Sequence, residues 1–199
     1  MRKFLGIGIL MAAMALPAKA QITPKYEIGG GYQYMAYYSS AGAPRINMNG
    51  WDASVTYNLC QRIAVGFDVS GNYNRQSSSD PAVNGATTHV YTYLAGPRIF
   101  PFGHHKLSLF GEVLFGEAHV HASIPALPPF PQRTLTDQAY SWTGGAGVDY
   151  ALGDHWAIRV QGDYLSTRFF SSAAGSQGNE RVIAGVVYRF GVRGPRRHK

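Results

Sequence analysis

The sequence is poor in cysteine, in charge and in long apolar runs. Cys60 is the single cysteine among 199 residues, so no internal disulfide can hold the fold. Beyond the first 20 residues, no apolar run approaches the roughly 18 residues that a membrane helix needs, which argues against a helical membrane protein. Charged residues make up only 15% of the chain, but 45% of residues are hydrophobic and 13% aromatic, which argues against intrinsic disorder. The length fits a single domain.

Excess positive charge is confined to the two ends of the chain. The formal net charge is +7, yet residues 1–20 and 191–199 together carry seven of the 18 Lys and Arg residues. Residues 21–190 therefore hold 11 basic and 11 acidic side chains and are neutral. This part has no basic stripe of the kind that nucleic-acid-binding proteins carry, so we expect no nucleic-acid partner.

The first 20 residues have the three parts of a secretory signal peptide. Arg2 and Lys3 form a positive start, residues 4–16 form an apolar stretch of 13 residues, and residues 18–20 read Ala-Lys-Ala, a cleavage site. The apolar stretch is too short to span a membrane. We therefore predict export and cleavage after residue 20.

Apolar and polar residues alternate through most of the remaining chain, with the period of a β-strand. In residues 62–73, for example, Val65 and Phe67 alternate with Gly66 and Asp68. The alternation predicts eight strands, over residues 26–38, 50–59, 62–73, 88–99, 106–118, 139–152, 156–167 and 181–190. Soluble strands typically have about five or six residues, whereas about 9 to 11 are needed to cross a bilayer with tilt. The predicted lengths favour a membrane.

Short and long connections alternate along the predicted strands. The short ones lie at residues 60–61, 100–105 and 153–155, and the long ones at residues 39–48, 75–87, 119–138 and 169–180. Short periplasmic turns, long extracellular loops and an even strand count are typical of outer-membrane barrels. The sequence thus predicts an all-β protein: an eight-stranded antiparallel up-and-down transmembrane β-barrel over residues 21–190, after a cleaved signal peptide. A basic periplasmic tail follows over residues 191–199.

Lysine is almost absent from the predicted barrel, where only Lys25 and Lys106 occur. The exterior of a soluble barrel, such as a lipocalin, is normally rich in Lys and Glu. Here the polar face of the strands holds Gly, Ser, Thr, Asn, Asp and Arg, which are small or compact groups that a narrow lumen accepts. We therefore predict that lipid contacts the apolar face.

Aromatic residues on the apolar face are expected where the strands meet the two lipid interfaces, as in the girdles of outer-membrane barrels. The predicted girdle comprises Tyr57, Tyr150, Trp156, Tyr188 and Phe190 near the short turns, and Tyr34, Trp51, Tyr73, Tyr140 and Trp142 near the long loops.

Three segments carry a resemblance to a known family: NGWDASVTYN at residues 49–58, YTYLAGPR at 91–98 and VVYRF at 186–190. The chain resembles the small eight-stranded outer-membrane β-barrel proteins of Gram-negative-type bacteria, which include the OmpA transmembrane domain, OmpX and opacity-type proteins. The resemblance implies a place in the bacterial outer membrane, surrounded by its lipid. It also implies that Phe190, with Tyr188 two residues earlier, is the signal read by the barrel-insertion machinery, although nine residues follow Phe190 here.

The inward face of the predicted strands carries ten charged residues. These are Glu27, Asp52, Asp68, Arg98, Glu112, Asp149, Arg159, Asp163, Arg181 and Arg189. An eight-stranded barrel is just wide enough for side chains to fill it, and charges away from water must pair. We therefore predict one polar network that fills the lumen, with Asp149 opposite Arg159 across the turn at 153–155. Glu27 and Arg189 should meet where the first and last strands close the barrel.

These features predict an integral outer-membrane protein, a monomer, with a structural or surface-interaction role and with no catalytic residues, cofactor or metal. One alternative is a small ion-conducting porin. Another is a lipid-A-modifying enzyme, for which the candidate cluster is His119, His121 and Ser123 with Glu117, but its spacing matches no esterase motif. A metal site would need the distant His89 as well, because His-x-His supplies only two ligands on one face of a strand.

The connections offer further contacts. Residues 123–133 hold four prolines, a stiff segment that displays apolar groups to a surface partner or folds over the barrel mouth. His104 and His105 lie in a predicted periplasmic turn, where we expect them to meet water or lipid headgroups. The basic tail could touch anionic envelope polymers or remain solvated.

Overall fold

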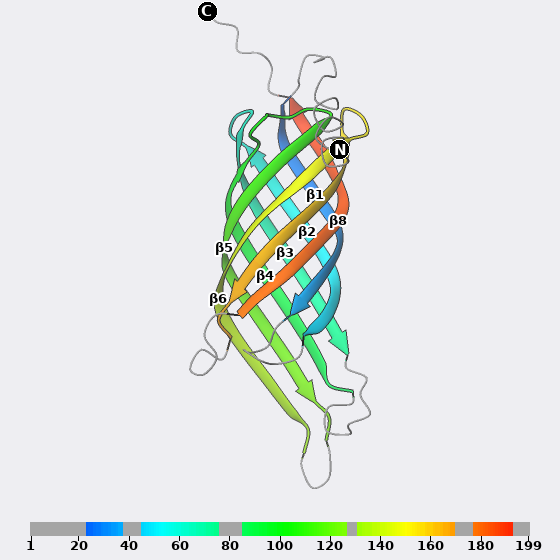
Figure 1. Ribbon diagram of the computed structural model, residues 1–199, viewed down its shortest axis with the longest axis vertical. Coiled ribbons are helices and arrows are strands. Elements are labelled where there is room, and N and C mark those ends of the chain that lie inside the picture. Colours follow the sequence, from blue (N-terminus) through cyan, green and yellow to red (C-terminus); the bar gives the residue numbers. More distant parts are fainter. Residues whose placement is uncertain (1–22, 38–44, 76–84, 127–130, 170–176, 193–199) are drawn as a thin grey trace, which may run out of the picture.

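The computed structural model describes residues 23–37, 45–75, 85–126, 131–169 and 177–192. Eight strands form a closed antiparallel barrel in which each strand pairs with its neighbours in the sequence and β8 pairs with β1 (Figure 1). The strands are β1 (Pro24–Tyr37), β2 (Ile46–Asn58), β3 (Ile63–Arg75), β4 (Thr87–Ile99), β5 (Leu107–Ile124), β6 (Arg133–Ala151), β7 (Trp156–Thr167) and β8 (Gln177–Val192). The predicted all-β up-and-down barrel is confirmed.

Three predicted features lie outside the described residues: the signal peptide at 1–20, the tail from residue 193 onwards, and the tip of the proline-rich loop at 127–130. β8 itself continues to Val192, two residues beyond the predicted end of the barrel. In the described part of the chain, no helix is long and apolar enough to cross a membrane.

The strands extend further into the long-loop end than the alternation predicts, above all in β5 and β6. Residues 119–124 and 133–138, predicted as loop, form a ladder that runs to the pair Ile124↔Arg133. β5 also pairs with β4 out to Thr87↔Ser123. The prediction was wrong here because both faces of this hairpin carry polar residues, so the alternation fades although the backbone pairing continues. Figure 1 shows this hairpin reaching beyond the other strands at the lower end of the view.

The two faces of the barrel are opposite in character to those of a soluble barrel. Val65, Phe67 and Ile158 point outwards and are 45 to 48% exposed. Asp149 and Arg159 point inwards and are 0% and 4% exposed. This arrangement is stable only where lipid covers the outer face, because about 30 exposed large apolar side chains would otherwise contact water.

Glycine is required where β1 and β8 close the barrel. Gly31 lies opposite Gly185 in the register. A Cβ atom at Gly31 would lie within 3 Å of the Ala184 carbonyl, and one at Gly185 within 3 Å of the Gly30 carbonyl. The two backbones therefore approach more closely at this point than any other residue type allows.

The interior has two parts. Towards the short turns it holds inward-facing charged residues together with a small apolar cluster of Ala64, Phe100 and Phe110. Towards the long loops, buried apolar side chains form a cluster of Met35, Tyr37, Met48, Val90, Leu94, Leu114, Ala118, Val120, Ala139, Leu165 and Phe169. The barrel therefore contains a small apolar core of its own between the charged residues and the long loops.

Candidate functional site

All ten charged residues that the sequence places on the inward face are buried, with exposures of 0 to 7%. Every strand contributes at least one of them, and β7 and β8 contribute two each. The inward positions follow from the strand period, because every second side chain of each strand points into the barrel. Contacts between these side chains divide the polar interior into three levels.

The level nearest the short turns joins two arginines to two carboxylates. Arg159 donates from Nε to Asp149 Oδ1 at 2.7 Å and from Nη2 to Asp149 Oδ2 at 2.8 Å. Arg159 Nη2 also donates to Glu27 Oε2 at 3.1 Å, and Arg189 Nη2 donates to Asp149 Oδ2 at 2.8 Å. Arg189 Nε lies 3.6 Å from Glu27 Oε1, across the seam where β1 pairs with β8. The four charges compensate one another within one buried group.

His104 closes this level from the side of the short turns, and this corrects the prediction that it meets water or lipid headgroups. Its side chain is buried, with Nε2 at 3.0 Å from Glu27 Oε1 and Nδ1 at 3.3 Å from the Gln61 carbonyl oxygen. The ring packs on Phe100 with the centroids 4.1 Å apart. Gly103, with a φ of 74°, turns the chain immediately before His104. The turn between β4 and β5 therefore folds into the barrel mouth.

The middle level is built on Arg98. Its Nε donates to Glu112 Oε2 at 2.7 Å and its Nη1 donates to Thr56 Oγ1 at 2.9 Å. The guanidinium groups of Arg98 and Arg159 each lie 4.7 Å from the centroid of the Phe110 ring. The ring attracts both cations and so connects this level with the level nearest the short turns.

The level nearest the long loops has more carboxylates than cations. Arg181 Nη2 donates to Asp163 Oδ2 at 2.9 Å, and Arg181 Nη1 lies 3.6 Å from Asp68 Oδ1. Gln161 donates to Asp163 at 2.9 Å. Asp52 lies diagonally across from Asp68 and interacts with it, while its Oδ2 has no hydrogen-bond partner among the described residues. Three carboxylates thus surround one guanidinium next to the apolar cluster.

The predicted girdle residues lie on the outer face. Seven are exposed, namely Trp51, Tyr140, Trp142, Tyr150, Trp156, Tyr188 and Phe190, and the remaining three, Tyr34, Tyr57 and Tyr73, are half-buried. Near the short turns, Tyr188 packs on Trp156 at 4.9 Å and on Phe190 at 5.9 Å between centroids. Tyr26, which the predicted girdle omits, continues this row at 5.4 Å from Phe190.

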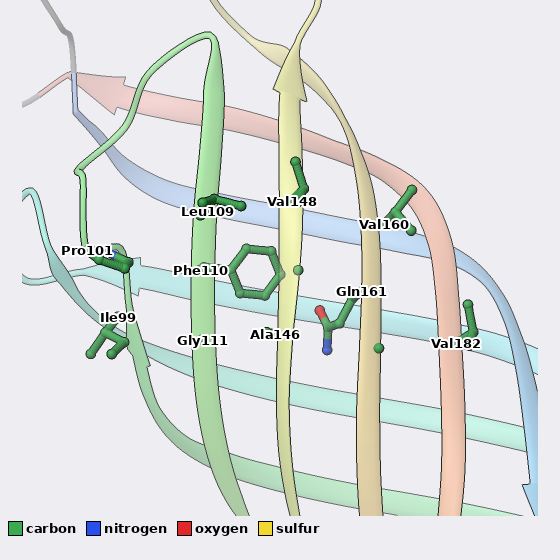
Figure 2. Close-up of a pocket in the computed structure, with 12 residues that line it drawn as sticks. Ile99, Pro101, Leu109, Phe110, Gly111, Ala146, Val148, Val160, Gln161 and Val182 are labelled. Atoms are coloured by element: carbon green, nitrogen blue, oxygen red, sulfur yellow. The ribbon is translucent and has the colours of Figure 1, made fainter. Parts of the chain in front are cut away.

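A hollow of about 610 Å³ interrupts the outer wall across β5, β6 and β7. It forms because Gly111, Ala146 and Gly162 follow one another in the register and have little or no side chain. Figure 2 shows Leu109 and Val160 among the apolar side chains around it. The hollow faces the same surroundings as the rest of the apolar wall, so lipid chains can fill it.

The residues of the enzyme alternative are not arranged as a nucleophile and a base. Ser123 Oγ accepts a hydrogen bond from Gln132 at 3.1 Å, and His121 Nδ1 lies 3.1 Å from Thr136 Oγ1. His119 Nε2 lies 3.8 Å from Glu117 Oε2. Neither imidazole shares a described hydrogen bond with Ser123, so this cluster gives no support to nucleophilic catalysis.

Comparison with known proteins agrees with this architecture. The profile of the outer membrane protein beta-barrel domain matches residues 7–190. No curated protein sequence matches the chain. The attachment invasion locus protein Ail of Yersinia pestis is 17% identical, with a TM-score of 0.62 over 84% of this chain and 99% of Ail. A second structure of Ail holds the heparin analogue sucrose octasulfate.

Two further structures share the fold. Neisserial surface protein A is 12% identical, with a TM-score of 0.60 over 83% of this chain and 97% of that protein. OprG from Pseudomonas aeruginosa is 11% identical, with a TM-score of 0.53 over 85% of this chain and 97% of OprG.

Proposed function

Because this chain belongs to the outer membrane protein β-barrel family and is a bacterial outer-membrane protein, we propose that it is a non-enzymatic, monomeric barrel with a closed lumen. Its role is then structural or interactive and is exerted at the extracellular end. The alternatives of an ion-conducting porin and of a lipid-A-modifying enzyme are the outcomes that the experiments below distinguish.

The filled interior is the observation that carries this proposal. The Glu27, Arg98 and Arg181 levels follow one another across the lumen, each with hydrogen-bonded partners from several strands. The apolar cluster occupies the interior towards the long loops, where Leu94 and Leu114 are fully buried. Water and ions would have to displace paired charges and packed apolar groups in turn, and both are costly.

Conductance of the purified protein in planar bilayers tests the closed lumen. We expect no steady single-channel openings at neutral pH, because paired charges and packed apolar side chains occupy the interior. Steady openings of uniform size would support the porin alternative and contradict the proposal.

The projecting β5–β6 hairpin supports an interactive role. Its β6 strand carries the exposed residues Thr134, Thr136 and Gln138, well beyond the last pair with β7 at Ser141↔Thr167. Arg133 and Arg75 are exposed at the same end of the barrel. We propose that a surface partner contacts this hairpin, and that sulfated saccharides are the first chemistry to test, since Ail has been crystallised with one.

A trimmed variant tests this role. Ser123 and Thr134 are direct partners in the ladder, and Ser123 is the last β5 residue that pairs with β4, so residues 124–133 can be replaced by an Asn-Gly turn while Val120 and the β4–β5 pairing are kept. Cells that display the complete protein should bind immobilised heparin, and cells that display the trimmed protein should not. Equal binding by both would contradict a role for the hairpin.

Mass spectrometry of lipid A, with and without expression of the protein, tests the enzyme alternative. We expect the same acyl pattern in both samples. A changed pattern would overturn the non-enzymatic assignment.

The remaining partners follow from the family and from the last strand. We propose that outer-membrane lipid surrounds the apolar wall and that the barrel-insertion machinery recognises β8, where Tyr188 and Phe190 are exposed on the outer face.

A further inference from the structure

The strand register brings together three histidines that are far apart in the sequence. His89 on β4 lies directly opposite His121 on β5, and His119 lies opposite Tyr91, the next outward position along β4. All three have odd numbers in strands whose odd positions face outwards, so the imidazoles share one face. This face lies at the long-loop end, next to the exposed Glu117.

We propose that His89, His119 and His121 form a surface site for a transition-metal cation, with Zn²⁺ as the probe that best matches the ligands. The Cβ atoms of direct cross-strand neighbours are about 5 Å apart, and those of diagonal neighbours are within about 8 Å. Imidazole nitrogens bind Zn²⁺ at about 2.1 Å, and three histidines with an open fourth position are a known zinc geometry. A His-x-His pair supplies two of these ligands, and the adjacent strand supplies the third.

The three side chains are available because none is fixed in a packed core. His121 is exposed, and His89 and His119 are half-buried. His89 packs edge-on against Tyr73 at 5.2 Å, while His121 contacts Thr136. Among the described residues, no three His, Cys, Asp or Glu side chains are already gathered to hold a metal ion. The rings must therefore rotate towards one another, which side chains at a surface do readily.

The charges around the three rings favour a cation. The Glu117 carboxylate lies 3.8 Å from His119 Nε2 and is 58% exposed, so it can either orient that ring or occupy the fourth position. Arg75 lies opposite Thr87, on the side of His89 away from His119. The carboxylate thus flanks the site next to His119, and the Arg75 cation lies beyond the opposite end of the site, past His89.

Calorimetric titration of the refolded full chain with ZnCl₂ tests the site. All proteins carry His198→Ala, so that the histidine of the tail cannot contribute, and none carries an affinity tag. We expect one saturable site at pH 7.5, with affinity lowered about tenfold or more by each of H89A, H119A and H121A. The control H155A, which removes an exposed histidine from a periplasmic turn, should bind as the parent does.

Heat-modifiable migration on a detergent gel confirms that each variant remains a folded barrel. As a second measurement, the Cu²⁺ electron paramagnetic resonance spectrum should show nitrogen coupling from several imidazoles in the parent protein, and fewer in H121A. The proposal is overturned if the parent shows no saturable Zn²⁺ binding. It is equally overturned if folded H89A, H119A or H121A binds Zn²⁺ as tightly as H155A does.

Discussion

Arg159 on β7 donates hydrogen bonds to both carboxylate oxygens of Asp149 on β6, at 2.7 and 2.8 Å, and the two residues are direct partners across the ladder. A bidentate pair of this kind is strong and geometrically specific. Arg159 also donates to Glu27 on β1, and Asp149 also accepts from Arg189 on β8. The pair therefore links four strands at the level nearest the short turns.

Removal of one partner of this pair should destabilise the barrel severely. In R159A, the Asp149 and Glu27 carboxylates lose their main shared cation, and a broken buried pair costs about 3–5 kcal/mol. Urea unfolding in lipid vesicles, followed by tryptophan fluorescence, measures the change. K106A, an exposed charge that lies over the Tyr150 ring, is the control and should cost about 1 kcal/mol or less. Equal losses in the two variants would contradict the account of this level.

The excess of carboxylates around Arg181 predicts opposite effects for two conservative substitutions. D52N removes like-charge repulsion with Asp68 at an oxygen that has no described partner, so stability should be unchanged or higher by up to about 1 kcal/mol. D163N weakens the 2.9 Å hydrogen bond from Arg181, so stability should fall by about 1–3 kcal/mol. The same unfolding assay compares the two variants. A larger loss of stability for D52N than for D163N would contradict the arrangement of the level nearest the long loops.

His104 predicts a contribution to stability from the barrel mouth at the short turns. Its ring nitrogens face the Glu27 carboxylate and the Gln61 carbonyl, and its ring packs on Phe100. H104A should lower the free energy of unfolding by about 1–3 kcal/mol, because it removes a buried hydrogen bond to a charged group. H155A removes an exposed histidine and should cost about 0.5 kcal/mol or less in the same assay. Equal losses in the two variants would contradict a structural role for His104 at this mouth.

The close approach of β1 and β8 at Gly31 predicts that a larger residue there prevents the barrel from closing. In G31A, the added methyl group would press on the Ala184 carbonyl, and the backbone cannot move aside without breaking the β1–β8 ladder. In G162A, the methyl group meets nothing within 4 Å, so the variant should fold normally. The yield of the heat-modifiable form after refolding compares the two. Equal yields would show that the close approach at Gly31 is not required.

The sequence could predict the parts of the interior that depend on local spacing. The short turn at 153–155 fixes Asp149 opposite Arg159, and the strand period places both on the inward face. The meeting of Glu27 with Arg189 also follows, because a closed barrel must pair its first and last strands. These relationships need only the strand order and the period.

Relationships that depend on register between strands distant in the sequence could not be predicted. His89 and His121 are 32 positions apart, and only the β4–β5 ladder shows that they are neighbours. The inward turn of His104 depends on a backbone turn at Gly103 with positive φ, which a six-residue connection does not reveal. The apolar cluster was missed because Leu94 and Leu114 each stand between polar or glycine inward residues of their own strands, and the cluster assembles only across several strands.

Access of small thiol reagents to the lumen tests the closed interior most directly. Ser141 is fully buried, points inwards and has no hydrogen-bond partner for its hydroxyl among the described residues, so S141C is a mild change. In a C60S background this cysteine should react with a small methanethiosulfonate reagent at a negligible rate until the barrel unfolds, whereas the exposed Cys60 of the parent reacts at once. Rapid labelling of S141C in the folded barrel would contradict a filled lumen.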